Sequence, residues 1–170
     1  MTGREQQLLR SLPDILNYKS IFYIGASQRR VEMIGLFEEK GYDITIMEAW
    51  KPNVDALRER FPKIFQGDVR DIDRLKMLPR FDIIMWWHGP EHAPIEELPK
   101  ILTWLEMKAL KIIVVANPWG IYKQGEIDGN PYEVHRASVY AKFYTDLGWR
   151  TNVLGKKDTR GSNLLAWKRH

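Results

Sequence analysis

Short, almost entirely apolar segments alternate along this chain with longer segments in which apolar residues recur at helical spacing. The clearest apolar segments are Ile21 to Ile24, Asp82 to Trp87 and Lys111 to Ala116. Strands that are apolar at consecutive positions are typical of parallel sheets whose two faces are both covered by helices. Regular alternation of such strands with helices predicts repeated βαβ units. We therefore predict an α/β fold, a doubly wound three-layer sandwich.

Turn formers and helical spacing divide the rest of the chain. Further strands are expected at Asp43 to Met47, Lys63 to Gln66, Arg150 to Leu154 and Asn163 to Lys168. Helices are expected at Glu5 to Leu16, Arg30 to Lys40, Asn53 to Arg60, Asp71 to Met77, Ile95 to Leu105 and Val134 to Leu147. Only the turn-rich residues 155–162 separate the last two strands, and no crossover helix fits there. We therefore expect a mostly parallel seven-stranded sheet with an antiparallel last strand.

Length and composition describe an ordinary globular domain. The chain has 170 residues, of which 44% are hydrophobic and 28% are charged. This length favours a single domain over residues 1–170, beginning with a helical segment at 1–19. The long, glycine-containing loop at 117–131 is typical of a lid or binding loop. The sequence has no cysteine, which excludes disulfides, thiolate catalysis and cysteine-ligated metal sites.

Neither hydrophobicity nor charge points to a membrane. No segment approaches the roughly 20 apolar residues that span a bilayer, and the N-terminal residues mix charges with leucines rather than forming a signal peptide. We therefore expect a cytoplasmic protein. The net charge of +4 is concentrated near the C-terminus, which we interpret as a solvated surface, with a nucleic-acid partner as the alternative. The basic residues there are Lys156, Lys157, Arg160, Lys168 and Arg169.

Three residues suited to ligand binding stand at the ends of successive strands. Gly25 follows the first strand, Glu48 the second and Asp68 the third. In an open parallel sheet, ligands bind beyond the carboxyl ends of the strands. Glu48 lies 23 residues after Gly25, close to the spacing of about 20 at which an acid binds ribose in dinucleotide folds. We expect a crevice for a nucleoside, although Ser27 and Arg30 replace the second and third glycines of the dinucleotide fingerprint.

This arrangement resembles the class I S-adenosylmethionine-dependent methyltransferases, over Ser20 to Lys168. The Gly-Pro-Glu-His segment after the fourth strand and the terminal antiparallel strand also resemble that family, which has a Rossmann-like fold. The resemblance implies S-adenosylmethionine as the cofactor. It implies that Gly25 lies in the loop around the methionine part, Glu48 on the ribose and Asp68 near the adenine amine. The cofactor-binding residues expected on this basis are Tyr23, Gly25, Ala26, Glu48, Ala49, Asp68, Val69 and Trp87.

Catalytic and acceptor-binding residues are expected after the fourth and fifth strands. His88 is the first candidate for a general base, because an imidazole accepts protons near neutral pH; Glu91 and His92 are its alternatives. The loop after the fifth strand mixes aromatic, cationic and flexible residues, which suits closure over an acceptor. His135 is expected to begin the last long helix and to face the same cleft. The substrate-binding candidates are Trp119, Tyr122 and His135, and a small-molecule acceptor is expected.

Three other functions each fit one part of this sequence. The segment from His88 to His92 matches H-x-x-E-H, a zinc-protease signature. Gly89 and Pro90 interrupt the continuous helix that this signature needs, so we expect no metal site and no zinc hydrolase. The single glycine of the first loop favours a non-catalytic cofactor or nucleotide sensor as one alternative. The basic C-terminal region favours a nucleic-acid methyltransferase as the other.

Overall fold

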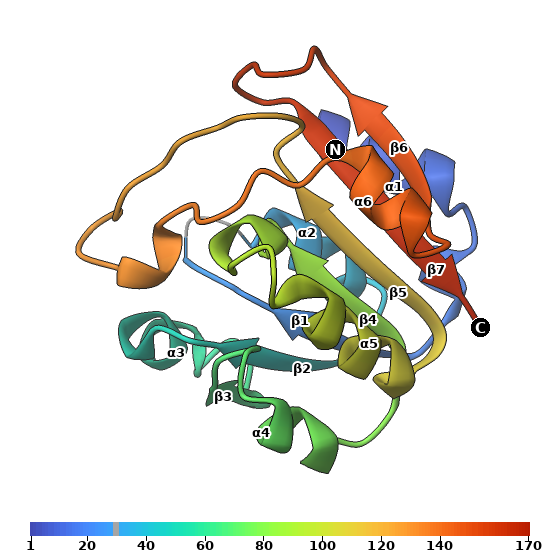
Figure 1. Cartoon of the computed structure of the whole chain (residues 1–170). Helices are drawn as coiled ribbons and strands as arrows, with labels where there is room; N and C mark the ends of the chain where they lie inside the picture. Colours follow the sequence, from blue (N-terminus) through green and yellow to red (C-terminus); the bar gives the residue numbers. More distant parts are fainter. Residues whose placement is uncertain (29–30) are drawn as a thin grey trace.

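The computed structural model describes residues 1–28 and 31–170. Within this part of the chain, seven strands form one sheet in the order β3-β2-β1-β4-β5-β7-β6 (Figure 1). β7 is antiparallel to both of its neighbours, and every other pair is parallel, which confirms the predicted sheet. The strands are β1 (Ser20–Ile24), β2 (Asp43–Glu48), β3 (Ile64–Gln66), β4 (Phe81–Trp87), β5 (Ala109–Asn117), β6 (Arg150–Leu154) and β7 (Asn163–Arg169).

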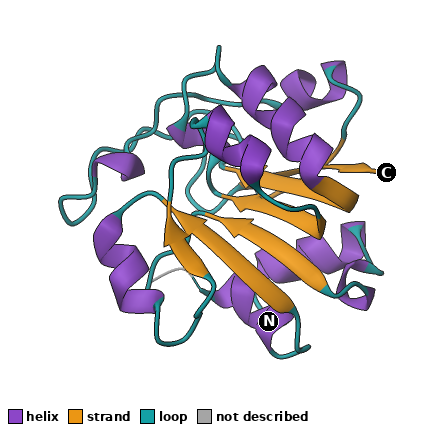
Figure 2. Cartoon of the chain, turned by 90° about the horizontal axis from the view of Figure 1, so that it is seen from below, coloured by secondary structure: helices purple, strands orange, loops and turns teal. Residues whose placement is uncertain are grey.

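Helices cover both faces of this sheet and complete the predicted three-layer sandwich (Figure 2). Alternate residues of a strand serve different cores: in β1, Ile21 and Tyr23 belong to one core, Phe22 and Ile24 to the other. Burial of both faces explains why the strand sequences are continuously apolar. None of the described helices is long and apolar enough to cross a membrane. On the first face lie α1 (Gly3–Ser11), α2 (Glu32–Glu38) and α3 (Lys51–Leu57); on the second lie α4 (Ile72–Met77), α5 (Leu98–Lys108) and α6 (Ala141–Asp146).

The N-terminal helix is shorter than predicted. α1 ends at Ser11, and a separate 3-10 turn, η1, covers Ile15–Asn17. Pro13 lies between them and has no backbone N–H with which to continue the helix. The start of the next predicted helix, at Arg30, lies outside the described residues. These differences change helix ends and leave the sheet intact.

The helix predicted over Val134 to Leu147 is wrong in its first half. Only α6 is helical there, and residues 134–140 form an irregular segment. The backbone N–H groups of Arg136 and Ala137 donate to the carbonyl oxygen of Glu91, at 2.7 and 3.0 Å. These bonds replace helical ones, so His135 does not begin a long helix.

A second correction concerns the start of α5. The predicted helix at Ile95 begins instead at Leu98, because the short 3-10 helix η2 (Pro90–His92) and a turn come first. Further along, the loop after β5 arches to a third 3-10 helix, η3 (Pro131–Glu133) (Figure 1). The start of this loop is held to the β6–β7 connection: the carbonyl oxygen of Trp119 accepts hydrogen bonds from Asp158 N at 3.0 Å and Ser162 Oγ at 3.2 Å.

Candidate functional site

A cavity of about 350 Å³ lies beyond the carboxyl ends of β1 to β4. Its volume is in the range of small-molecule sites, and its position is the one at which open α/β sheets bind ligands. Segments near η2 and η3 close its other side. The lining residues are Tyr23, Ile24, Gly25, Ala26, Ser27, Met47, Glu48, Ala49, Asn53, Gly67, Asp68, Val69, Arg70, Trp86, Trp87, His88, Gly89, His92, Ala93, Asn130, Pro131, Tyr132, Glu133 and Arg136.

One part of the cavity, which we call the carboxylate end, is formed by Gly25, Glu48 and Asp68. Gly25 has φ +78°, a conformation that side-chain-bearing residues rarely adopt. Its N–H donates to the carbonyl oxygen of Met47 at 2.9 Å, and Ala26 N donates to Glu48 Oε2 at 2.9 Å. The turn after β1 is therefore fixed to the end of β2, with its backbone lining the cavity.

Glu48 is held at the cavity wall by several donors. Besides Ala26, Trp50 N donates to Glu48 Oε1 at 2.8 Å and Asn53 Nδ2 at 3.4 Å. The residue is only 6% exposed, and burial raises the pKa of its carboxyl above the usual value, against the hydrogen bonds that favour the charged form. Because each carboxylate oxygen has two acceptor sites, Glu48 can accept further hydrogen bonds from a ligand.

Asp68 is paired with Arg70 at the same end. Arg70 N donates to Asp68 Oδ1 at 2.9 Å, and the guanidinium forms an ion pair with Oδ2 at 2.5 Å. Burial alone would raise the pKa of Asp68, but the hydrogen bonds from Arg70 outweigh it and hold this pKa below its usual value. Asp68 is therefore ionised and partly neutralised by its neighbour.

A second group of residues, which we call the histidine end, comprises His88, Glu91, His92 and His135. His88 and His92 line the cavity, whereas Glu91 and His135 contact them from outside the lining. His88 directly follows β4 and has φ +51°, a strained conformation for a residue with a side chain. The next residue must be glycine, because a Cβ atom at Gly89 would lie 1.7 Å from Trp86 Nε1. His88 Nδ1 lies 3.3 Å from Glu91 Oε1, where it donates to the carboxylate.

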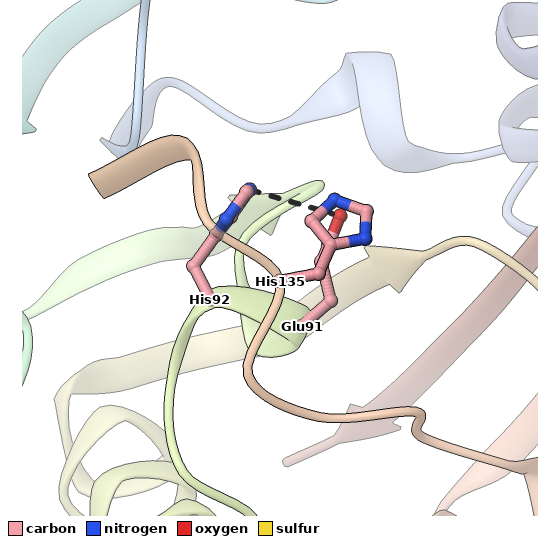
Figure 3. A group of neighbouring side chains, drawn as sticks. All are labelled: Glu91, His92 and His135. Carbon is pink, nitrogen blue, oxygen red and sulfur yellow. Dashed lines mark ion pairs between the residues drawn. The ribbon is translucent and has the colours of Figure 1, made fainter. Parts of the chain in front are cut away.

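Glu91, a predicted catalytic residue, is 2% exposed and is not among the residues that line the cavity. Its burial would raise the pKa of the carboxyl, but the hydrogen bond from His88 and the positive charge that His88 and His92 carry when protonated hold that pKa below the usual value. His92 Nε2 lies 3.9 Å from Glu91 Oε1 (Figure 3). The rings of His92 and His135 meet edge to face with centroids 4.9 Å apart. Four ionisable side chains thus gather here from the turn after β4, from η2 and from the segment before α6.

The structure brings most of the predicted site residues together. All eight residues expected to bind the cofactor line the cavity, and so do His88 and His92. Three substrate-binding candidates, Trp119, Tyr122 and His135, lie outside the lining. Tyr122 instead packs against the His135 ring, with centroids 5.7 Å apart. The functional role of each residue stays a prediction.

Sequence reasoning missed the wall that follows the long loop. Asn130, Tyr132, Glu133 and Arg136 line the cavity, although they stand far from any strand end. One signal was available in the sequence, because Asn130 directly precedes a proline. In the structure, the Asn130 side chain accepts a hydrogen bond from Tyr132 N at 3.0 Å, as the side chain of a helix N-cap residue does. An Asn-Pro pair at that position indicates an ordered turn.

Neither a family model nor a curated protein matches this sequence. Solved structures do match. A SAM-dependent methyltransferase from Archaeoglobus fulgidus is 18% identical with a TM-score of 0.71, covering 98% of this chain and 93% of its own. A Rhodobacter sphaeroides protein, provisionally described as a Zn-dependent alcohol dehydrogenase, is 13% identical with a TM-score of 0.72, covering 99% and 90%. Magnesium protoporphyrin IX methyltransferase from Synechocystis PCC 6803, with bound SAH, is 12% identical with a TM-score of 0.66, covering 98% and 83%. The chain has the fold of class I S-adenosylmethionine-dependent methyltransferases.

Proposed function

We propose that this chain binds S-adenosylmethionine in the cavity and transfers its methyl group to a small-molecule acceptor. The observation that carries the proposal is the carboxylate end: Gly25, Glu48 and Asp68 stand on three neighbouring strand ends and line one cavity. Solved structures with the same fold include methyltransferases with bound SAH or SAM. The fold and the polar groups of the cavity therefore favour the same ligand.

The residues present fit the parts of this cofactor. The bare backbone at Gly25 allows close approach of a ligand chain. The Oε2 atom of the buried Glu48 carboxylate accepts one hydrogen bond from the protein and can accept another from a ribose hydroxyl. The Asp68 carboxylate, ionised beside Arg70, can accept a hydrogen bond from the adenine amine. Trp86 and Trp87 also line the cavity, and aromatic faces stabilise a cationic sulfur by about 0.5–2 kcal/mol.

The chain's own contribution to transfer is positioning and proton acceptance. S-adenosylmethionine supplies a methyl group on a cationic sulfur; an acceptor lone pair attacks the methyl carbon, the S–C bond breaks, and a neutral thioether leaves. The walls of the cavity can hold the acceptor in line with the S–C bond. His88 donates through Nδ1 to Glu91, so Nε2 carries the lone pair of the neutral ring. Nε2 is buried in this structure, so the ring has to turn towards the cavity before it takes a proton from the acceptor.

Charge pairing favours a small acceptor over a nucleic acid. Two of the basic C-terminal residues are already paired: Lys168 Nζ lies 2.6 Å from Glu106 Oε1, and the Arg169 guanidinium lies 2.5 Å from Asp14 Oδ1. These ion pairs reduce the positive potential that would attract phosphates. The wall formed by Asn130 and Tyr132 further encloses the cavity.

Calorimetric titration of the chain with S-adenosylmethionine, S-adenosylhomocysteine and NAD tests the proposal. We expect saturable binding of the two sulfur compounds and none of NAD, which lacks its glycine cradle here. Binding of NAD alone would overturn the proposal in favour of a dehydrogenase. Binding of both sulfur compounds without methyl transfer to any member of an acceptor library would leave a sensor instead.

A further inference from the structure

Two imidazoles and a carboxylate converge beside the cavity in an arrangement that the proposed transfer does not use. One ligand atom each from Glu91, His92 and His135 lies within 4.8 Å of the others (Figure 3). Glu91 and His92 come from η2, and His135 comes from the segment between η3 and α6. We propose that Glu91, His92 and His135 form a binding site for a divalent transition-metal ion at the edge of the cavity.

Hydrogen bonds to the backbone orient both histidines for coordination. His92 Nδ1 lies 3.2 Å from the carbonyl oxygen of Val134, and His135 Nδ1 is hydrogen-bonded to the carbonyl oxygen of Tyr122. A carbonyl oxygen only accepts, so each Nδ1 carries the proton and each neutral ring has its lone pair on Nε2. Metal-binding histidines characteristically donate their other N–H in this way, which fixes ring orientation and tautomer.

Glu91 supplies an independent sign of a missing partner. Its Oε1 atom lies 3.3 Å from His88 Nδ1 and 3.9 Å from His92 Nε2, whereas its Oε2 atom has no hydrogen-bond partner among the described residues. A buried carboxylate oxygen without a partner is costly, and coordination to a cation removes that cost. His88 then acts as the outer partner that holds the carboxylate, as hydrogen-bond donors around ligating carboxylates do.

The backbone holds the third ligand in place. The carbonyl oxygen of Glu91 accepts hydrogen bonds from Arg136 N and Ala137 N, directly after His135. In a tetrahedral zinc site, ligand atoms about 2.1 Å from the ion lie roughly 3.4 Å apart. The three ligand atoms lie within 4.8 Å of one another without an ion, so binding has to draw them closer, and the His92 and His135 side chains are both only partly buried.

The donor set indicates the kind of metal. Two nitrogens and one oxygen suit Zn²⁺ and related first-row ions, whereas Mg²⁺ and Ca²⁺ prefer oxygen ligands alone. Three protein ligands leave at least one coordination position open, as in catalytic zinc sites. Because His92 also lines the cavity, that position can hold an oxygen of the methyl acceptor, a consequence that rests on the proposed function.

Metal titration of the chain without an affinity tag tests the site. We expect one Zn²⁺ per chain by calorimetry, and Co²⁺ to give an absorption band on binding. His135→Ala should weaken Zn²⁺ binding at least tenfold and abolish the Co²⁺ band, and Glu91→Gln should do the same. His170→Ala is the matched control, because His170 is exposed and belongs to no such cluster; it should change neither result.

Two outcomes would overturn the metal site: wild-type chain that binds no Zn²⁺, or His135→Ala chain that binds it as tightly as wild type. His135 is partly exposed, so this variant tests the site even where Glu91→Gln impairs folding, which circular dichroism checks. Titration with S-adenosylmethionine separates the two proposals. Zn²⁺ binding without cofactor binding overturns the proposed function alone; cofactor binding without Zn²⁺ binding overturns the metal site alone.

Discussion

The two ends of the cavity are held together by contacts of different range. At the carboxylate end, Glu48 binds Trp50 two residues away and Ala26 on the adjacent strand end. At the histidine end, the decisive contact joins Glu91 to Arg136, 45 residues further along the chain. The order of the strands brings the residues of the carboxylate end together, whereas the histidine end depends on the position of the irregular segment at residues 134–140. The two ends should therefore respond separately to substitution.

Removing the Glu48 carboxylate should have the largest effect. Glu48→Ala loses the acceptor of the ribose hydroxyls, and charge-assisted hydrogen bonds contribute roughly 1.5–3 kcal/mol each. We expect calorimetry to show S-adenosylmethionine binding weakened about 100-fold, with Zn²⁺ binding unchanged. Glu59→Ala is the control, because Glu59 is an exposed acid outside the cavity lining, and this variant should bind the cofactor normally. Loss of Zn²⁺ binding in Glu48→Ala would mean that the two ends are one unit.

Gly89→Ala should destabilise the histidine end by overpacking. The new Cβ would overlap the Trp86 indole, so the strand end must shift, at a cost of about 1–3 kcal/mol. Thermal unfolding should then occur roughly 3–10 °C lower than in wild type. Gly125→Ala is the matched control, because nothing lies within 4 Å of a Cβ there. Equal melting temperatures for all three proteins would contradict the tight packing at Gly89.

Acidification should act mainly through Glu48. Burial raises the pKa of this carboxyl, so it protonates at a higher pH than an exposed glutamate and then accepts ribose hydroxyls poorly. Cofactor affinity should fall as pH drops through the raised pKa of Glu48, in a range where the Glu48→Gln variant shows a flat profile.

Stability should change in the opposite sense. The folded state binds this proton more tightly than the unfolded chain, so the contribution of Glu48 to stability declines as pH rises from the unfolded pKa through the raised one. Urea unfolding of wild type and Glu48→Gln across this range measures the difference. A constant difference at every pH would show that Glu48 does not titrate abnormally.

Asp68→Asn should have the smallest effect. Asp68 is already paired with Arg70, so its field at the cavity is partly neutralised, and an amide oxygen still accepts a hydrogen bond. We expect cofactor affinity to fall about fivefold, near 1 kcal/mol. Titration with S-adenosylmethionine measures this change in affinity. A loss of affinity as large as that of Glu48→Ala would indicate that Asp68 binds the ribose instead.

The fold and the carboxylate end were predictable because their signals are local. Gly25, Glu48 and Asp68 each adjoin a strand, and parallel strands bring their carboxyl ends to one edge. Two predicted helix boundaries were wrong. The first helix ends before Pro13, a residue whose effect the sequence shows, and α5 starts later than predicted because a turn follows η2.

The histidine end was only partly predictable. His88 and His92 follow β4 directly, and both line the cavity as expected. The place of His135 depends on backbone hydrogen bonds from Arg136 and Ala137 to Glu91, and any residue except proline can donate such bonds. These backbone hydrogen bonds leave no pattern of side chains in the sequence, so the apolar spacing over 134–147 predicted a helix instead.

The left-handed backbone at His88 also governs which mutations this corner of the protein can sample. Asparagine and aspartate occupy that conformation more often than other side chains, glycine adopts it freely, and β-branched residues almost never do. A library randomised at position 88 will thus be filtered by folding before selection for activity begins. Variants with a new activity can therefore carry only a few residue types at position 88.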